Sequence, residues 1–155
     1  MTQADVAVHG RVEWALGDFT VVPGLRLDVF ATQTDRLEPP IGDAPRLGVF
    51  RIEPAIAPRL SARWAATDAL SVHAATGKYH QPPRAADLSP VFGNPQLGIS
   101  DALHLVGGVK WTPMDGLNVE VTGFYEQFDN LVARAPETTP PLGEALRNDG
   151  TGESK

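Results

Sequence analysis

Hydrophobic and polar residues alternate with a period of two along most of the chain, and this pattern predicts β-strands with one apolar and one polar face. The first run begins at Val6, and its apolar positions are Val6, Val8, Val12, Trp14 and Leu16. Further alternating runs cover residues 19–32, 59–64, 70–75, 103–111 and 117–132. No segment of useful length has a helical period. The sequence therefore predicts an all-β protein, an antiparallel up-and-down meander of about six long strands.

The connections between these runs alternate between short and long. Short turns are predicted at 17–18, 67–68 and 113–116, and long Pro/Gly-rich loops at 33–54, 81–100 and 135–147. In an up-and-down sheet alternate connections lie at opposite ends, so all short turns share one end. This asymmetry, with alternating segments of about ten residues, is typical of a transmembrane β-barrel wall of the outer-membrane type.

Two details of the strands are also predicted. Pro23 removes a hydrogen-bond donor and Gly24 weakens the strand, so we expect a bulge or a strand start at this point. Residues 148–152 resemble the lead-in to a strand that we expect the chain not to contain.

All three tryptophans, Trp14, Trp64 and Trp111, lie just before a short turn. An indole ring is best placed at a boundary between apolar and aqueous surroundings. We therefore expect the three side chains to share one face of the sheet at one end, as an aromatic girdle.

The polar face carries charges of both signs, which suit a water-filled lumen. The predicted lumen-facing residues are Arg11, Glu13, Arg26, Asp28, Arg63, His73, Lys110 and Glu120. Charge complementarity predicts three cross-strand pairs, namely Glu13 with Arg26, Arg11 with Asp28, and Lys110 with Glu120.

A soluble antiparallel β-sandwich, used as a binding or adhesion module, alternates in the same way and is the alternative. The two architectures differ in the apolar face, which a sandwich buries under a second sheet and a barrel wall leaves uncovered. The mixed-charge face and the two loops of about twenty residues favour the barrel. The residues expected to be exposed are Val8, Val12, Leu27, Val29, Leu60, Leu70, Val72, Leu105, Val109, Val119 and Val121.

Composition excludes several functions. The chain has 155 residues, enough for one domain without a second, and its net charge of −6 argues against a nucleic-acid partner. It has no cysteine, and no apolar run approaches the length of a transmembrane helix. Residues 1–5 carry no basic or apolar signal region, so we expect no secretory signal in this sequence. The four histidines lack metal-ligand spacing, and Ser61 and Ser71 lack a nucleophile context, so we expect no enzyme, no cofactor and no metal site.

Several phrases resemble the β-barrel of TonB-dependent outer-membrane receptors. They run in order from about residue 12 to the end of the chain, and their letters are VPGLRLD (22–28), PRLSARW (58–64), GKYHQPP (77–83), FGNPQL (92–97), GGVKW (107–111), VTGFY (121–125) and NDGTG (148–152). The chain departs from the family because we find no plug, no N-terminal energy-coupling box and no terminal strand that ends in an aromatic residue. Barrels of plugged transporters have about 22 strands.

The resemblance implies that residues 1–155 are part of a receptor β-barrel domain in the bacterial outer membrane, with no separate second domain. The family imports scarce nutrients such as siderophores, vitamins or glycans. The implied partners are outer-membrane lipid, the plug and the remaining barrel strands, the energy-transducing TonB protein acting through that plug, and a small-molecule nutrient. No loop motif identifies the nutrient.

Overall fold

The structure, a computed structural model, describes residues 2–34 and 50–155. Nearly all of the regular structure is β-strand, as the alternating pattern predicts. The elements are β1 (Thr2–Arg11), β2 (Trp14–Leu16), β3 (Phe19–Gln33), β4 (Phe50–Ala65), β5 (Leu70–Gln81), the 3-10 helix η1 (Ala85–Leu88), β6 (Ser100–Met114), β7 (Leu117–Arg134) and β8 (Leu146–Ser154).

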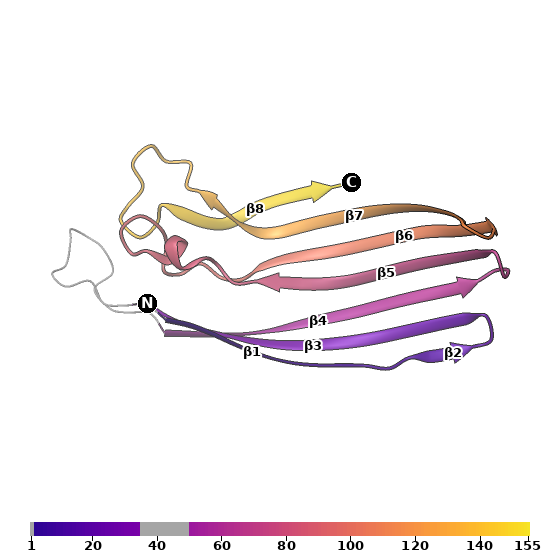
Figure 1. The fold of residues 1–155 in the computed structure, drawn as a ribbon. Helices are drawn as coiled ribbons and strands as arrows, with labels where there is room; N and C mark the ends of the chain where they lie inside the picture. The colour runs from indigo at the N-terminus through magenta and orange to yellow at the C-terminus, as the bar shows by residue number, and fades with distance from the viewer. Residues whose placement is uncertain (1, 35–49) are drawn as a thin grey trace.

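The strands form a single antiparallel sheet in the order β1-β3-β4-β5-β6-β7-β8, with β2 paired to β3 as a continuation of β1 (Figure 1). Every neighbour in this order is also the next long strand along the chain, so the predicted up-and-down meander is confirmed. The sandwich alternative is wrong, because no second sheet packs on the first within the described residues.

The short turns lie together at one end of the sheet, as predicted (Figure 1). Gly17 (φ 61°) and Gly116 (φ 83°) take the left-handed conformation that two of these turns need, which is open to glycine at little cost. The connections 82–99 and 135–145 lie at the opposite end (Figure 1). Of the predicted loop 33–54, residues 35–49 lie outside the described part of the chain, and residues 50–54 belong to β4.

The predicted irregularity at Pro23 is in the partner strand instead. β3 runs unbroken through Pro23 and Gly24, whereas the opposite strand is interrupted between Arg11 and Trp14. The N–H of Val12 donates to the carbonyl oxygen of Pro23 at 3.1 Å, but proline has no N–H to return the bond. One missing donor therefore separates β1 from β2.

The C-terminal expectation is also corrected. Residues 148–152 are not a lead-in to a missing strand, because they lie inside β8, which pairs with β7 from Glu126↔Ser154 to Arg134↔Leu146. The frequent glycines and polar residues of this segment hide its strand character from a periodicity argument.

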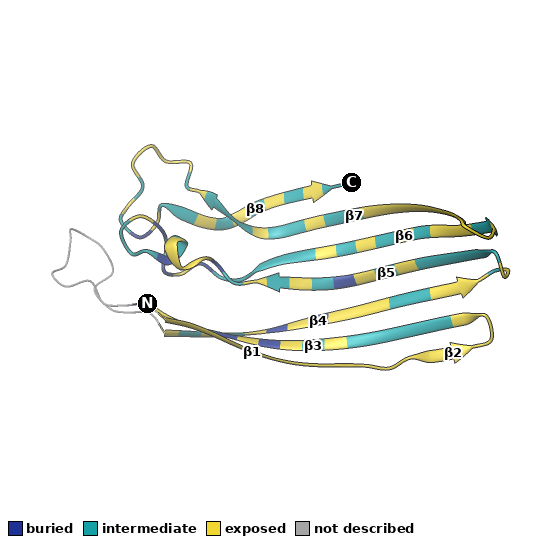
Figure 2. Cartoon of the chain, viewed as in Figure 1, coloured by how far each residue is buried: buried dark blue, intermediate teal, exposed yellow. Residues whose placement is uncertain are grey.

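Few side chains are buried, and most of them belong to β3, β4 and loop 82–99 (Figure 2). The buried hydrophobic residues are Phe30, Ala55, Ala57, Leu88 and Leu97. Of the eleven apolar-face residues expected to be exposed, nine are at least 40% exposed, and Leu70 and Val72 are half-buried. A single sheet with an uncovered apolar face results.

Candidate functional site

The register fixes which side chains share a face of the sheet. Arg26 is the register partner of His9 and Ala57, Arg63 of His73, His73 of Gly108, and Lys110 of Glu120. Because partners share a face, seven of the eight predicted lumen-facing residues lie on one polar face, namely Arg11, Arg26, Asp28, Arg63, His73, Lys110 and Glu120. Glu13 lies in the interruption between β1 and β2 and has no register partner.

Two of the three predicted charge pairs are wrong. Arg26 faces His9, not Glu13, and Asp28 faces Ala7, not Arg11. The Gly17-Asp18 turn has only two residues between Leu16 and Phe19, which shifts the partners by four positions from those that we expected. Asp28 is buried and pairs with Arg26 of its own strand, whose Nη2 lies 2.8 Å from Oδ1.

The third pair is confirmed in register, since Lys110 and Glu120 are direct partners on β6 and β7. This hairpin could be predicted because Pro113–Gly116 defines its turn from the sequence.

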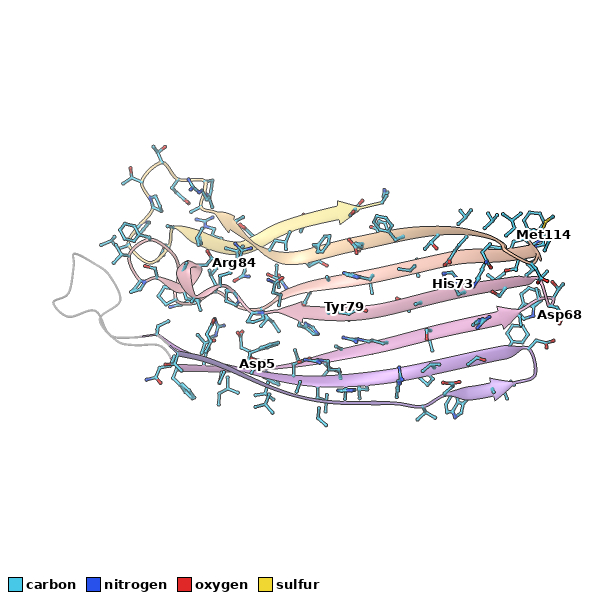
Figure 3. The ribbon with its side chains drawn as sticks, viewed as in Figure 1. Asp5, Asp68, His73, Tyr79, Arg84 and Met114 are labelled. Carbon is cyan, nitrogen blue, oxygen red and sulfur yellow. The ribbon has the colours of Figure 1, made fainter. Side chains whose placement is uncertain are left out.

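A row of side chains that the sequence analysis missed crosses the middle of the polar face. Register partners in one line are Arg11, Gly24, Arg59, Gly77, His104 and Glu126, one from each of β1, β3, β4, β5, β6 and β7. The guanidinium of Arg59 lies 4.6 Å from the ring centroid of Tyr79, which projects from the middle of the sheet (Figure 3). The Tyr79 and His104 ring centroids are 4.5 Å apart, and His104 Nδ1 lies 3.4 Å from Glu126 Oε1.

Glycine makes this arrangement possible. A Cβ on Gly77 would lie 3.1 Å from Cγ of Arg59 and 3.3 Å from Cε2 of Tyr79. Two rows nearer the short turns on the same face, a Cβ on Gly108 would lie 2.7 Å from the ring of His73. In both rows a large polar side chain lies flat over a cross-strand glycine. The sign of these contacts is a glycine paired across the strands with a bulky polar residue. This pairing can be recognised only when the strand register is known.

The first of these rows borders a hollow on the polar face of about 820 Å³, and the lining of this hollow includes His9, Arg11, Arg26, Arg59, Tyr79 and His104. Within the described residues, Arg11 and Arg59, which line the hollow, and Arg63, which lies outside it, have no carboxylate partner, whereas Arg26 is neutralised by Asp28. Gly24 lies between Arg11 and Arg59 in the row, so no side chain separates the two cations. The hollow therefore presents uncompensated positive charge beside an aromatic surface.

The three tryptophans lie on the opposite, apolar face. Trp14 is the partner of Val21, Trp64 of Val72, and Trp111 of Leu70, all close to the short turns. They are 55%, 43% and 50% exposed. Phe19 stacks on Trp64 with ring centroids 5.5 Å apart and an interplanar angle of 2°.

Loop 82–99 is tied to both halves of the sheet at the other end. Arg51 of β4 donates to the carbonyl oxygen of Leu97 at 3.0 Å. On the far side, the N–H of Gly98 donates to Oδ1 of Asn148 at 2.7 Å, and Asn148 Nδ2 donates to the Asn130 carbonyl oxygen at 2.7 Å. The loop is thus a brace from β4 to β8, built on the FGNPQL phrase.

No helix in the described part of the chain is long and apolar enough to cross a membrane. No group of three or more His, Asp or Glu side chains in residues 2–34 and 50–155 could hold a metal ion.

A single meander with one exposed apolar face and one charged face is a section of a β-barrel wall of the outer-membrane type. The family described as "TonB dependent receptor-like, beta-barrel" matches residues 1–155. The chain belongs to that family, whose members are outer-membrane receptors and transporters of Gram-negative bacteria, and its localisation is the outer membrane.

Solved structures of this fold are similar over most of the chain at low identity. The FrpB iron transporter from Neisseria meningitidis is 19% identical with a TM-score of 0.72, covering 96% of this chain and 22% of that one. The copper transporter OprC is 15% identical with a TM-score of 0.70, covering 84% and 22%. The ferric-catecholate import receptor Fiu from E. coli K12 is 16% identical with a TM-score of 0.65, covering 97% and 24%.

The chain thus spans less than a quarter of the length of these three proteins. A search of curated protein sequences finds no match.

Proposed function

We propose that this chain is one sector of the barrel wall of a receptor that takes up a scarce nutrient with energy passed from the inner membrane. The observation that carries the proposal is the division of the sheet into an uncovered apolar face and a charged face that surrounds a hollow. An outer-membrane transporter needs the first against lipid and the second toward its aqueous interior.

The wall requires further strands. The sheet is open at β1 and β8, and an unpaired strand edge inside lipid would leave its N–H and C=O groups without hydrogen bonds. Additional strands of the same receptor would cover both edges. Residues 1–155 then form part of one barrel domain, with no separate second domain.

In this proposal the polar face is the lumen wall. We infer that its lumen-facing residues are the seven predicted residues that share the polar face, together with Arg59, Tyr79 and His104. The partners are a plug domain inside the barrel, the TonB protein that acts through the plug, and a small-molecule nutrient. Arg11, Arg59 and Arg63 supply the uncompensated positive charge that carboxylates of the plug or an anionic nutrient would neutralise.

The apolar face contacts outer-membrane lipid, and Trp14, Trp64 and Trp111 form a girdle at the end that carries the short turns. In barrels of this type the short turns are periplasmic. Loops 82–99 and 135–145 are then at the cell surface. The chain has no catalytic role in this account.

The nutrient class is a siderophore, vitamin or glycan, and among these we favour a metal chelate. Similarity to an iron transporter, a copper transporter and a ferric-catecholate receptor supports this choice. The cationic hollow suits an anionic chelate better than a neutral sugar.

The test is uptake by cells that express the full-length receptor. Radiolabelled ferric catecholate, copper chelate, cobalamin and an oligosaccharide are offered separately, with and without a protonophore. Accumulation of one metal chelate that the protonophore abolishes is the expected result. Accumulation that persists without the proton gradient would contradict energy coupling, and accumulation of the oligosaccharide alone would contradict the ligand class.

A further inference from the structure

β4 and β5 are hydrogen-bonded along only part of their length. Their ladder runs from Ala65↔Ser71 to Arg59↔Gly77. Both strands continue beyond that point, β4 back to Phe50 and β5 on to Gln81 (Figure 1). We call the unpaired stretch, residues 50–58 of β4 and 78–81 of β5, the seam.

Two prolines explain where the ladder stops. Successive residues of a strand direct their N–H and C=O groups to opposite neighbours. The N–H of Ala65 donates to Asp18 at 2.8 Å, on the β3 side, so the even-numbered residues of β4 are directed toward β5. Pro54 and Pro58 are therefore residues whose missing N–H groups would have bonded β5.

A histidine side chain crosses the seam in place of the ladder. If the register of Arg59↔Gly77 continued, His80 would stand opposite Ile56. Nε2 of His80 lies 2.9 Å from the carbonyl oxygen of Ile56. Nδ1 of the same ring lies 2.6 Å from Oδ1 of Asp101 on β6, and the His80 side chain is only 5% exposed.

Both ring nitrogens of His80 therefore face oxygen acceptors. A carbonyl oxygen only accepts, so the bond to Ile56 requires a proton on Nε2. The contact with Asp101 requires a second proton between Nδ1 and the carboxylate. The hydrogen bonds to Ile56 and to Asp101 can therefore exist together only when the His80 ring and the Asp101 carboxyl group share one extra proton. This extra proton is counted relative to a neutral imidazole beside an ionised carboxylate.

The surrounding charges decide what happens when that proton leaves. Lys78 Nζ lies 3.2 Å from Oδ2 of Asp101 and stabilises the carboxylate, while Asp129 is the register partner of Asp101 on β7. From β4, the group that faces the ring is the Ile56 carbonyl. A neutral ring has one N–H, and the charge-assisted bond to Asp101 is the stronger of the two. Ile56 is then left without its donor.

We propose that His80 forms a pH-sensitive contact in the wall. Its hydrogen bond to the Ile56 carbonyl oxygen holds β4 and β5 together across the seam at low pH and is lost as pH rises, so that the two strands separate there. On the polar face Arg51 still holds β4 to loop 82–99, so the release is local. The inference concerns the wall alone and does not depend on the nutrient.

The experiment measures the seam directly in the full-length receptor in detergent micelles. This segment contains no cysteine, so pairs of introduced cysteines can carry nitroxide labels. Leu25 and Leu103 are exposed on the apolar face, one on each side of the seam and in one row. Phe19 and Val109 are the matched pair, equally exposed and three strands apart across the intact ladder.

Pulsed electron spin resonance then gives distance distributions at about pH 5.5 and about pH 8.5, on either side of the ordinary histidine range. We expect the Leu25/Leu103 distribution to be narrow at low pH and to lengthen and broaden reversibly at high pH, with no change for Phe19/Val109. An unchanged Leu25/Leu103 distribution, or an equal change in both pairs, would overturn the proposal.

The Asp101→Asn variant distinguishes a pH-sensitive contact of His80 from a merely structural role of that side chain. The asparagine amide can donate to Nδ1 of a neutral ring, which leaves Nε2–H for Ile56. The seam should then stay closed at both pH values. His80→Gln should remove the pH response. A pH shift that persists in either variant would show that another group controls the seam.

Discussion

Arg59 lies over the ring of Tyr79 with its guanidinium carbon 4.6 Å from the ring centroid, and Gly77 is the residue that leaves room for this contact. The three residues join β4 to β5 at the last pair of their ladder, where the seam begins. The contact therefore stabilises the wall at the point where the ladder between β4 and β5 ends.

Gly77→Val is expected to lower the free energy of unfolding by about 1–3 kcal/mol, because the new side chain would overlap both Arg59 and Tyr79. Chemical denaturation of the receptor in micelles measures it. Gly123→Val is the matched control, since a Cβ on Gly123 meets no atom within 4 Å. Equal losses in the two variants would show that the cost is generic to replacing a strand glycine.

The stacked pair Phe19 and Trp64 should be energetically coupled by about 0.5–1.5 kcal/mol, since offset aromatic pairs contribute that much beyond their buried area. A double-mutant cycle of Phe19→Ala and Trp64→Ala measures the coupling. The corresponding cycle with Trp111, which is not in contact with Phe19, should give coupling within about 0.5 kcal/mol of zero. Strong coupling to Trp111 would contradict the observed packing.

Asn148→Ala should release the brace, because it removes the acceptor of the Gly98 N–H and the donor to the Asn130 carbonyl. We expect a loss of about 1–3 kcal/mol and faster amide exchange in residues 93–98. Asn118→Ala, which removes an exposed hydrogen bond with Thr112, is the control and should leave exchange in 93–98 unchanged. Unchanged exchange in the Asn148 variant would show that the brace is held elsewhere.

The sequence predicted the meander, the two faces and the common face of the tryptophans, because each depends on a period of two that is preserved when the register shifts by an even number of residues. The Lys110–Glu120 pair followed from a turn whose length was visible in Pro113–Gly116. The pairs of Arg26 and Asp28 failed because they did not follow the register that the predicted two-residue turn Gly17-Asp18 imposes, in which each partner lies four positions from the one that we expected.

The rest depended on contacts between residues far apart in the chain. Arg59, Tyr79 and His104 come from three strands and meet because Gly77 leaves room for them. The bonds of Asn148 to loop 82–99 span 50 residues. Neither contact changes the local hydrophobic pattern, so neither could be found from it.

The central claim is that one face of this sheet contacts lipid and the other does not. Ala74 and Ala75 test it with one residue type, since they are adjacent in the middle of β5, with Ala74 exposed on the apolar face and Ala75 beside the hollow. The measurement is the free energy of folding of Ala74→Arg and Ala75→Arg receptors into lipid bilayers. We predict a cost of about 2–4 kcal/mol for Ala74→Arg near the bilayer midplane and a much smaller cost for Ala75→Arg. Equal costs for the two variants would contradict the assignment of the faces.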